Sequence, residues 1–578
     1  MAPAPPRLGH PAPVGAATLV GMLHLLFFAC SPADSGRAGP ANDSAADTAP
    51  ADTAAAAVDH CDRLGLTVRP WVDAPDDATL YATAADLTLP TREGDWTFST
   101  AWTGCEVYLF IQEDPRQNQG FDKGIWERDG REFLEALPPN AHAFFLPSGR
   151  TEEEQTAALD LITDKLDRTL DNYDADTAAD YWRRLHFVTE RDSTLPGWLG
   201  DNMRSPAWGV GVDRFQRIRY VGSYADPSRY DANVGWFEPN LGMATNEAIY
   251  YNFEAARQDQ LDADGATVVS AFEGQQGGNA YDDVDIPAID AFDTLSVDLT
   301  MGCIGEGEYG TCPAWDYMAY AYLCDDPASD ENPYADTACA PGETLAGACV
   351  SPTGSERGGT YTCNETGTGY GALACDSCDT EIARWITTYH REGRWVHDIS
   401  PVLPLFAKGG SRRVRFYSDN SYDLTFALRF SNTGKGVVPQ HVSAVLVSEN
   451  TDTFAVPAAA TRVELATVIS QHGQTCGEFC DAEHHFLVNG DTAAEVVRSF
   501  PESGTELGCM EQVTSGTVPN QYGTWWYGRS GWCPGKDVPT VAHDITASVV
   551  IGGDNTLEYW TVGDAGSVRR AFWVVSSW

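Results

Sequence analysis

In the segment CIGEGEYGTCPAWD at residues 303–316, Cys303 and Cys312 bound a short loop, and the segment runs directly into the alternating stretch YMAYAYL. A disulfide across such a loop holds the residues that follow it in a fixed position, which a catalytic carboxylate needs and a solvated aspartate does not. Asp316, at the start of the predicted strand, is therefore the first candidate for chemistry. A loop of this kind is also a common structural brace in exported proteins, and spacing alone does not separate the two interpretations.

A second acidic residue lies in a similar setting. Glu478 is the central acid of CGEFC, residues 476–480, and a third cysteine-containing segment, RSGWCPG, follows at residues 529–535. Two acids in separate cysteine-bounded loops favour a site that assembles from distant parts of the chain.

The order of these motifs resembles the peptide:N-glycosidase F family. The shared pattern is C…C-x-x-W-D, then EIARWIT at residues 381–387, C-x-E-x-C and R-x-G-W-C-P-G, and it covers roughly residues 268–578. Members hydrolyse the bond between asparagine and the first N-acetylglucosamine of N-linked glycans. The family fold consists of two jelly-roll β-sandwiches with the site in the cleft between them.

The resemblance also implies roles for individual residues. Asp316 matches the principal catalytic acid, which would activate water or move protons at the amide, and Glu478 would hold the first sugar and stabilise charge. Arg529 would donate charge-assisted hydrogen bonds to sugar oxygens or to the developing oxyanion. No cofactor and no metal are implied. Substrate contacts are expected from residues in or beside the motifs, namely His472, Trp315, Phe479 and Trp532.

One departure from the family pattern bears on activity. The third family acid, a glutamate after a strand of the first sandwich, corresponds to Asp419 in VRFYSDNS, and the tryptophan expected two residues later is Ser421. Asp419 is one methylene shorter than the family residue. A noncatalytic surface protein that binds glycans without cleaving them therefore stays open as an alternative function.

A copper-dependent monooxygenase of the peptidylglycine type is the second alternative, because that class shares the double jelly-roll plan. It needs clusters of histidine and methionine ligands, and the chain has 12 His, 7 Met and no H-x-H pair. His484 and His485 are adjacent on a predicted strand and so point to opposite faces, which disfavours a shared metal.

The N-terminal residues predict export. An apolar run from Gly15 to Ala29 within residues 1–30 ends in LLFFAC, which is similar to a bacterial lipoprotein signal with Cys30 as the acylated residue. Ordinary secretion with cleavage nearby is the alternative. Residues 31–60 are rich in Pro, Ala, Asp and Ser and are predicted to form a disordered tether. We therefore expect an outer-membrane or cell-surface lipoprotein, or a secreted protein.

The cysteines fit that compartment. Of 15 cysteines, 14 remain without Cys30, an even number that predicts disulfides in an exported chain. Six cysteines fall in an insertion at residues 324–378 that the family pattern does not contain, and the sequence does not choose among their roughly 15 pairings. The other expected pairs are Cys303 with Cys312, Cys476 with Cys480, Cys509 with Cys533, and Cys61 with Cys105.

The charge of the chain limits its partners. The 37 basic and 83 acidic residues give a net charge of −46, which argues against nucleic acid and against direct binding to anionic membranes. Contact with a membrane is expected only through the lipid anchor. The expected partner is an N-linked glycopeptide or glycoprotein, and the protein is expected to be a monomer.

Residues 61–262 predict an α/β domain. A buried strand at VYLFI, a helix at residues 151–170 and strands at residues 186–190 and 217–223 alternate along the chain. The pattern resembles a thioredoxin-like domain. The loop after VYLFI contains no cysteine, so we expect a redox-inert module.

The remaining residues predict two antiparallel β-sandwich domains of the jelly-roll type, at 268–434 and 439–578. Apolar residues alternate with polar ones in the segments that contain Leu295, Val297, Leu299 and Met301, and again in Leu424, Phe426, Leu428 and Phe430. The predicted protein is thus multidomain, with one α/β domain followed by two sandwiches.

Overall fold

A computed structural model describes residues 60–113, 121, 124–127, 130–204, 209–305, 311–329, 331–445, 451–473 and 476–578. The predicted export signal, Cys30 and all of the predicted tether except its last residue lie outside this set, as does part of the loop after VYLFI. No helix among the described residues is long and apolar enough to cross a lipid bilayer.

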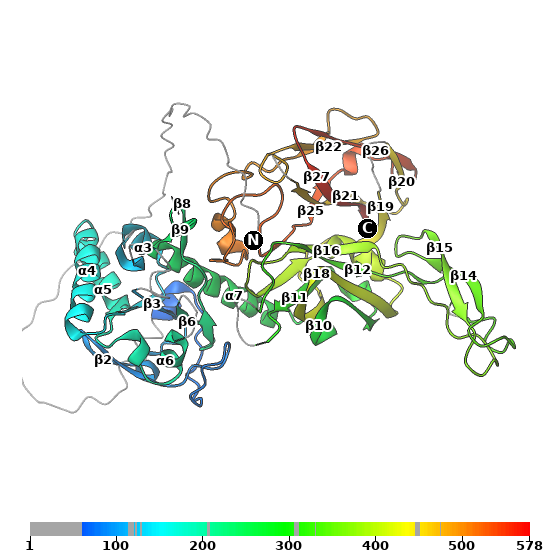
Figure 1. The fold of residues 1–578 in the computed structure, drawn as a ribbon. Helices are drawn as coiled ribbons and strands as arrows, with labels where there is room; N and C mark the ends of the chain where they lie inside the picture. The colour runs from blue at the N-terminus through cyan, green and yellow to red at the C-terminus, as the bar shows by residue number, and fades with distance from the viewer. Residues whose placement is uncertain are drawn as a thin grey trace, which may run out of the picture. The chain divides into compact units, whose positions relative to one another are not determined.

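A five-stranded mixed sheet organises the α/β region (Figure 1). Its strands run in the order β5, β4, β3, β6, β7, with bounds Leu185–Phe187, Ala141–Leu146, Val107–Gln112, Val210–Val212 and Ile218–Tyr220. The pairs β3–β4 and β4–β5 are parallel, whereas β3–β6 and β6–β7 are antiparallel. The α/β expectation is met in this region, and the thioredoxin-like resemblance stays a prediction.

Strands β3 and β4 are buried at every position, so both faces of the sheet must be covered. Leu109 packs in a core with Ile162 of α4 (Glu152–Leu170), while Phe110 on the opposite face packs with Trp198 of α6 (Gly197–Met203). The other helices include α2 (Phe98–Ala101), α3 (Gly130–Ala136), α5 (Ala175–Arg184) and α7 (Thr245–Ala263). Two hairpins complete the region, β1–β2 (Thr88–Thr91, Gly94–Thr97) and β8–β9 (Ala225–Asp231, Trp236–Pro239).

The predicted helix at residues 151–170 is confirmed as α4. The Thr151 side chain accepts a hydrogen bond from the Glu154 amide, and the Glu154 carboxylate accepts one from the Thr151 amide, which satisfies two amides at the helix start. The face predicted to be apolar is the buried one, formed by Leu159, Ile162, Leu166 and Leu170.

Two long antiparallel strands, β10 (Thr267–Ile286) and β18 (Gly410–Ser431), are the longest strands of the first β region and pair along most of their length. The first half of β18 pairs with β12 and its second half pairs with β11, so one strand serves two parts of the sheet. Register shifts near residues 270–279 interrupt the β10–β18 ladder, as bulges do where a sheet bends. The other strands are β11 (Thr294–Gly302), β12 (Met318–Leu323), β16 (Thr380–Ile386), β17 (Gly393–Asp398) and β24 (Lys536–Asp537).

The two segments with alternating apolar residues form strands, as the sequence predicts, and their apolar side chains are buried. Leu295, Val297, Leu299 and Met301 of β11 are buried, and so are Leu424, Phe426, Leu428 and Phe430 of β18. The short helix η5 (Ser400–Phe406) adds its apolar residues to the same core.

The second β region has two four-stranded antiparallel sheets with a shared core, an arrangement consistent with a sandwich. One sheet has the order β19, β27, β21, β25 (Pro439–Ala444, Ser567–Ser577, Arg462–His472, Val541–Asp544). The other has the order β20, β26, β22, β23 (Asp452–Ala455, Asp554–Val562, Glu483–Val488, Val496–Arg498). The jelly-roll type and the domain boundaries stay predictions.

Seven disulfides are present among the described residues. Four join the pairs expected from the sequence, Cys61–Cys105, Cys303–Cys312, Cys476–Cys480 and Cys509–Cys533. The insertion carries the other three, Cys324–Cys378, Cys339–Cys363 and Cys349–Cys375, around a small sheet of β13 (Asp326–Pro327), β14 (Thr344–Val350) and β15 (Glu356–Thr362). These disulfides fit an extracellular protein.

Candidate active site

Asp316 lies two residues before β12, and the backbone on both sides of it is fixed by one side chain. The Thr387 hydroxyl donates to the Trp315 carbonyl at 2.8 Å and accepts from the Tyr317 amide at 2.9 Å. The Thr387 amide also donates to the Tyr317 carbonyl at 2.8 Å. Together with the Cys303–Cys312 disulfide, this holds Asp316 without engaging its carboxylate.

Glu478 lies in the loop closed by Cys476 and Cys480, and that loop is bonded to the segment that carries Arg529. The Ser530 amide donates to the Glu478 carbonyl at 2.9 Å, and the Ser530 hydroxyl donates to the Cys480 carbonyl at 2.6 Å. The two motifs, which are separate in sequence, therefore form one local structure.

Arg529 is buried, with 1% of its surface exposed. Its guanidinium donates to the Tyr527 carbonyl at 3.0 Å and the Thr524 carbonyl at 3.3 Å. The guanidinium carbon lies 4.3 Å from the centre of the Phe479 ring. Backbone carbonyls and an aromatic face neutralise little of its charge, so the charge acts on nearby carboxylates.

The pKa shifts indicate that the two acids share this environment. Burial raises the pKa of Asp316, while a hydrogen bond from Tyr389 and the charge of Arg529 oppose the rise. Burial also raises the pKa of Glu478, with Arg529 opposing the rise and the negative charge of Asp316 adding to it. Asp316, Glu478 and Arg529 thus lie close enough for each charge to act on the others.

The raised pKa of Glu478 predicts a pH-dependent gain in stability for Glu478→Gln. A carboxyl with a raised folded-state pKa contributes stability that is present below its unfolded pKa and lost as the pH rises through the folded value. The glutamine variant avoids that loss, so its Tm should exceed that of the wild type at pH 7 and match it at about pH 4, below the usual glutamate value. Calorimetry at both pH values measures the difference, and a lower Tm for the variant at pH 7 would contradict the expected sign.

Tyr389 is a site residue that the sequence did not single out. Its hydroxyl donates to the Asp316 carboxylate and also contacts Arg529, and burial raises its pKa, with Asp316 adding to the rise. The Tyr389 amide donates to Gln521 Oε1 at 2.9 Å. A side-chain carbon at Gly523 would lie 2.3 Å from the Tyr389 ring, so this position needs glycine for the ring to fit.

A buried polar cluster lies behind the Tyr389 segment. Arg391, Asn520 and the Gly222 amide all donate to Glu247 Oε1, at 2.9, 3.0 and 3.0 Å. Arg391 also donates to the Pro519 carbonyl at 2.6 Å. Since Glu247 belongs to α7, the α/β region is bonded directly to the two segments that carry Tyr389 and Gln521.

Comparison with known proteins bears on the second β region. Residues 442–578 match the family model described as peptide-N-glycosidase F, C terminal. The resemblance to the peptide-N-glycosidase F family is confirmed for this region. No curated protein matches the chain.

Solved structures of this family are similar over part of the chain. PNGase F, a glycosylasparaginase from Flavobacterium meningosepticum, is 16% identical, with 54% of this chain and 96% of that chain covered and a TM-score of 0.37. A recombinant peptide:N-glycanase F is 18% identical with the same coverage and TM-score. A structure of PNGF-II is 14% identical, with 56% of this chain and 66% of that chain covered and a TM-score of 0.36.

The substrate-contact residues predicted from the peptide-N-glycosidase F pattern differ in exposure. Trp315 is 61% exposed beside Asp316, and Tyr317 on its other side is 40% exposed. Trp532 is buried, with its indole N–H donating to the Gln471 carbonyl at 2.7 Å. His472 stacks on Trp532 with a ring separation of 5.0 Å, and burial lowers the pKa of His472 to about 3, so this imidazole is neutral at pH 7.

Asp419, the shortened third acid of the peptide-N-glycosidase F pattern, is exposed and accepts a hydrogen bond from the Tyr417 hydroxyl at 2.7 Å. Ser418 pairs with Ala319 of β12, so Asp419 follows at the end of β12 where Asp316 lies. Among the described residues, no hydrogen bond or ion pair joins Asp419 to Asp316 or Glu478. Its catalytic role stays a prediction.

The two adjacent histidines point apart on β22, as predicted. His484 is fully buried and bonds to Gln471 and the Tyr559 hydroxyl, whereas His485 bonds to Glu495 and Glu483. Within the described part of the chain, no group of three or more His, Cys, Asp or Glu side chains is arranged to hold a metal ion.

Proposed function

We propose that this chain is an amidase that hydrolyses the bond between asparagine and the first N-acetylglucosamine of N-linked glycopeptides or glycoproteins. The observation that carries the proposal is the grouping of Asp316 and Glu478, from separate β regions, around the buried guanidinium of Arg529. In the reaction, water adds to the amide carbon and the carbon–nitrogen bond breaks. The glycosylamine leaves with a proton derived from that water, and aspartate remains on the peptide.

Asp316 suits the proton transfers of this reaction. Burial raises its pKa above that of a solvated aspartate, which makes it a better base, while Tyr389 and Arg529 favour its ionised form. The Tyr389 hydroxyl also fixes the direction of the carboxylate. Asp316 would take a proton from the attacking water and return it to the departing nitrogen.

Glu478 and Arg529 suit the binding of the first sugar and the stabilisation of charge. A carboxylate accepts hydrogen bonds from sugar hydroxyls, and the fixed guanidinium provides positive charge without reorganising during the reaction. The exposed rings of Trp315 and Tyr317 flank Asp316 and offer faces on which sugar rings can stack.

The direct test uses a denatured N-glycosylated protein. We expect a free glycan to appear together with conversion of the linked asparagine to aspartate, detected by mass spectrometry of the peptide. Release should be insensitive to a chelator. Stable binding of the glycopeptide without release would favour a noncatalytic glycan-binding protein. The exposed position of Asp419 is the observation that supports this alternative. Oxygen-dependent, chelator-sensitive turnover would favour the copper monooxygenase.

The raised pKa of Asp316 predicts how kcat/KM falls at acidic pH. If ionised Asp316 is the base, kcat/KM should fall as the pH drops through its folded-state pKa, which lies above the 3.8 of a free aspartate. Glycopeptide assays from pH 3 to pH 8 measure this midpoint. A profile that stays flat down to the value for free aspartate would show that the carboxylate is not the group that limits the rate.

Export and the lipid anchor are also proposed. Labelling with a radioactive fatty acid during expression in a bacterial host is expected to mark the wild type and not Cys30→Ser. Label retained in Cys30→Ser would place the modification elsewhere.

A further inference from the structure

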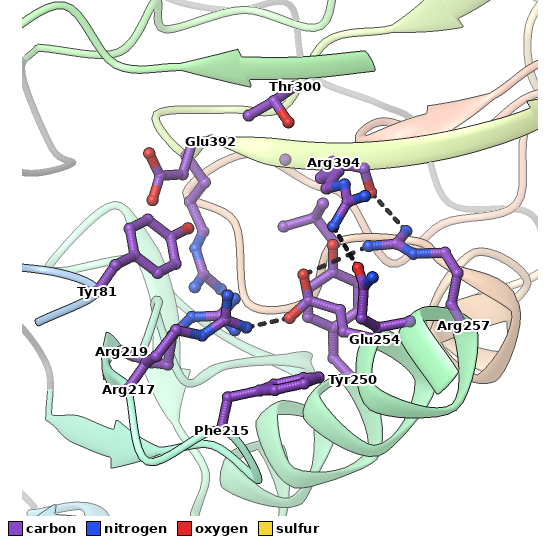
Figure 2. Close-up of a pocket in the computed structure, with 14 residues that line it drawn as sticks. Tyr81, Phe215, Arg217, Arg219, Tyr250, Glu254, Arg257, Thr300, Glu392 and Arg394 are labelled. Atoms are coloured by element: carbon purple, nitrogen blue, oxygen red, sulfur yellow. Dashed lines mark hydrogen bonds and ion pairs between the residues drawn. The ribbon is translucent and has the colours of Figure 1, made fainter. Parts of the chain in front are cut away.

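A cavity of about 410 Å³ lies where α7 and the loop before β7 meet β17 (Figure 2). Its volume falls in the range of roughly 300–1,000 Å³ that is usual for small-molecule sites. Asp316, Glu478, Arg529 and Tyr389 do not line it, so it is distinct from the candidate active site.

Seven of the 14 lining residues are charged, and each of the five arginines among them is paired with a carboxylate. Arg219 donates to Asp213 at 3.0 Å and to Glu254 at 2.7 Å. Arg394 makes two hydrogen bonds to Asp298, at 2.9 and 2.7 Å. These pairs fix the orientation of the lining groups before any ligand arrives and leave little net charge to attract a free anion.

Three buried polar atoms on lining residues have no hydrogen-bond partner among the described residues, namely Tyr250 Oη, Arg257 Nε and Glu392 Oε1. Tyr250 is 3% exposed. Leaving such atoms unpaired costs free energy, so an occupant that bonds to them after a small movement of the lining side chains is favoured. They comprise a hydroxyl that can donate and accept, one donor and one acceptor.

We propose that this cavity binds a neutral saccharide of one or two sugar units. Sugar hydroxyls both donate and accept hydrogen bonds, so they can bond to the Tyr250 hydroxyl, to the Arg257 N–H and to the Glu392 oxygen. A phosphate or a carboxylate would find the five lining arginines already paired with carboxylates, and an apolar ligand would leave all three atoms unpaired.

The cavity is connected to the candidate active site through the chain. The Glu392 carboxylate accepts a hydrogen bond from the Cys303 amide, at the start of the loop that leads to Asp316, and Glu392 is three residues from Tyr389. The saccharide would be a sugar of the same glycan or of a second glycan on the glycoprotein. That assignment of the source rests on the proposed amidase function, whereas the binding site itself does not.

The test compares Tyr250→Phe with Tyr224→Phe. Both remove a buried hydroxyl that has no partner in the part of the chain that the structure describes, and Tyr224 does not line the cavity. Both variants should therefore have a Tm at least as high as that of the wild type, which guards against a folding defect. Mannobiose and N,N′-diacetylchitobiose are the probes, titrated by calorimetry and by saturation-transfer NMR, and inorganic phosphate and N-acetylneuraminic acid are the anionic comparisons.

We expect one of the neutral probes to bind the wild type, to bind Tyr250→Phe about five- to twentyfold more weakly, and to bind Tyr224→Phe as tightly as the wild type. Equal binding by Tyr250→Phe, no binding of either neutral probe, or binding of the anions alone would overturn the proposal. Because binding is measured without turnover, its failure is distinct from a failure of the amidase assay.

Discussion

Replacing Asp316 by asparagine is expected to lower the kcat of glycan release by about 10³-fold, within the range that a lost general acid–base group usually costs. Asparagine keeps the size of the side chain and can still bond to Tyr389, but it cannot take a proton from water. Release from a labelled glycopeptide gives kcat and KM separately. Because the loss falls on proton transfer rather than on sugar binding, KM should change little.

Two further aspartate variants serve as comparisons. Asp160→Asn removes an exposed carboxylate that pairs with Arg92 on the α/β region, and its kcat should equal that of the wild type. Asp419→Asn tests the third predicted acid, and we expect a loss of less than about tenfold because its carboxylate bonds only to Tyr417 among the described residues. Full activity in Asp316→Asn would remove the proposed base from the mechanism.

The elements that the sequence predicts best are those with a local signature. Helix α4 has a capping pair at its start and one apolar face, and β11 alternates residue by residue, so neither depends on distant contacts for its identity. The cysteine-bounded loops of Asp316 and Glu478 are equally local. Their grouping around Arg529 is long-range, and only the ordered motifs of the family resemblance pointed to it.

Tyr389 and Thr387 show what the sequence could not supply. The chain has 23 tyrosines, and nothing around Tyr389 distinguishes the one whose hydroxyl meets Asp316. Thr387 lies in the family-like segment EIARWIT, yet its two bonds around Asp316 depend on where β16 ends beside β12. The pairing of the three disulfides in the insertion could not be predicted either, because sequence separation does not determine which cysteines meet.

The second large effect is expected from the buried cluster that joins the α/β region to the Tyr389 segment. Glu247 is fully buried and accepts from Arg391, which is 4% exposed. Glu247→Ala removes the carboxylate that accepts from that guanidinium, from the Asn520 side-chain amide and from the Gly222 amide. Removing one partner of a buried ion pair usually costs about 3–5 kcal/mol, so we expect a free energy of unfolding lower by that amount. Urea unfolding followed by circular dichroism measures the change.

Asp283→Ala is the matched control. It breaks the pair between Asp283 and Arg413, whose side chains are 52% and 49% exposed, and exposed pairs contribute at most about 1 kcal/mol. A loss in Glu247→Ala no larger than that of the control would show that Arg391 finds other acceptors, for which the Pro519 and Tyr220 carbonyls are already in place.

Glu247→Ala should also lower catalysis at temperatures where the protein is still folded. Arg391 is two residues from Tyr389, and Asn520 precedes the glutamine that holds the Tyr389 amide, so loosening of the cluster moves the hydroxyl that orients Asp316. Misplacement of an orienting group lowers kcat rather than substrate binding, by about tenfold or more. Glu247→Gln, which keeps the accepting Oε1, should recover much of this loss. A kcat unchanged in both variants would show that the α/β region stabilises the fold without positioning the site.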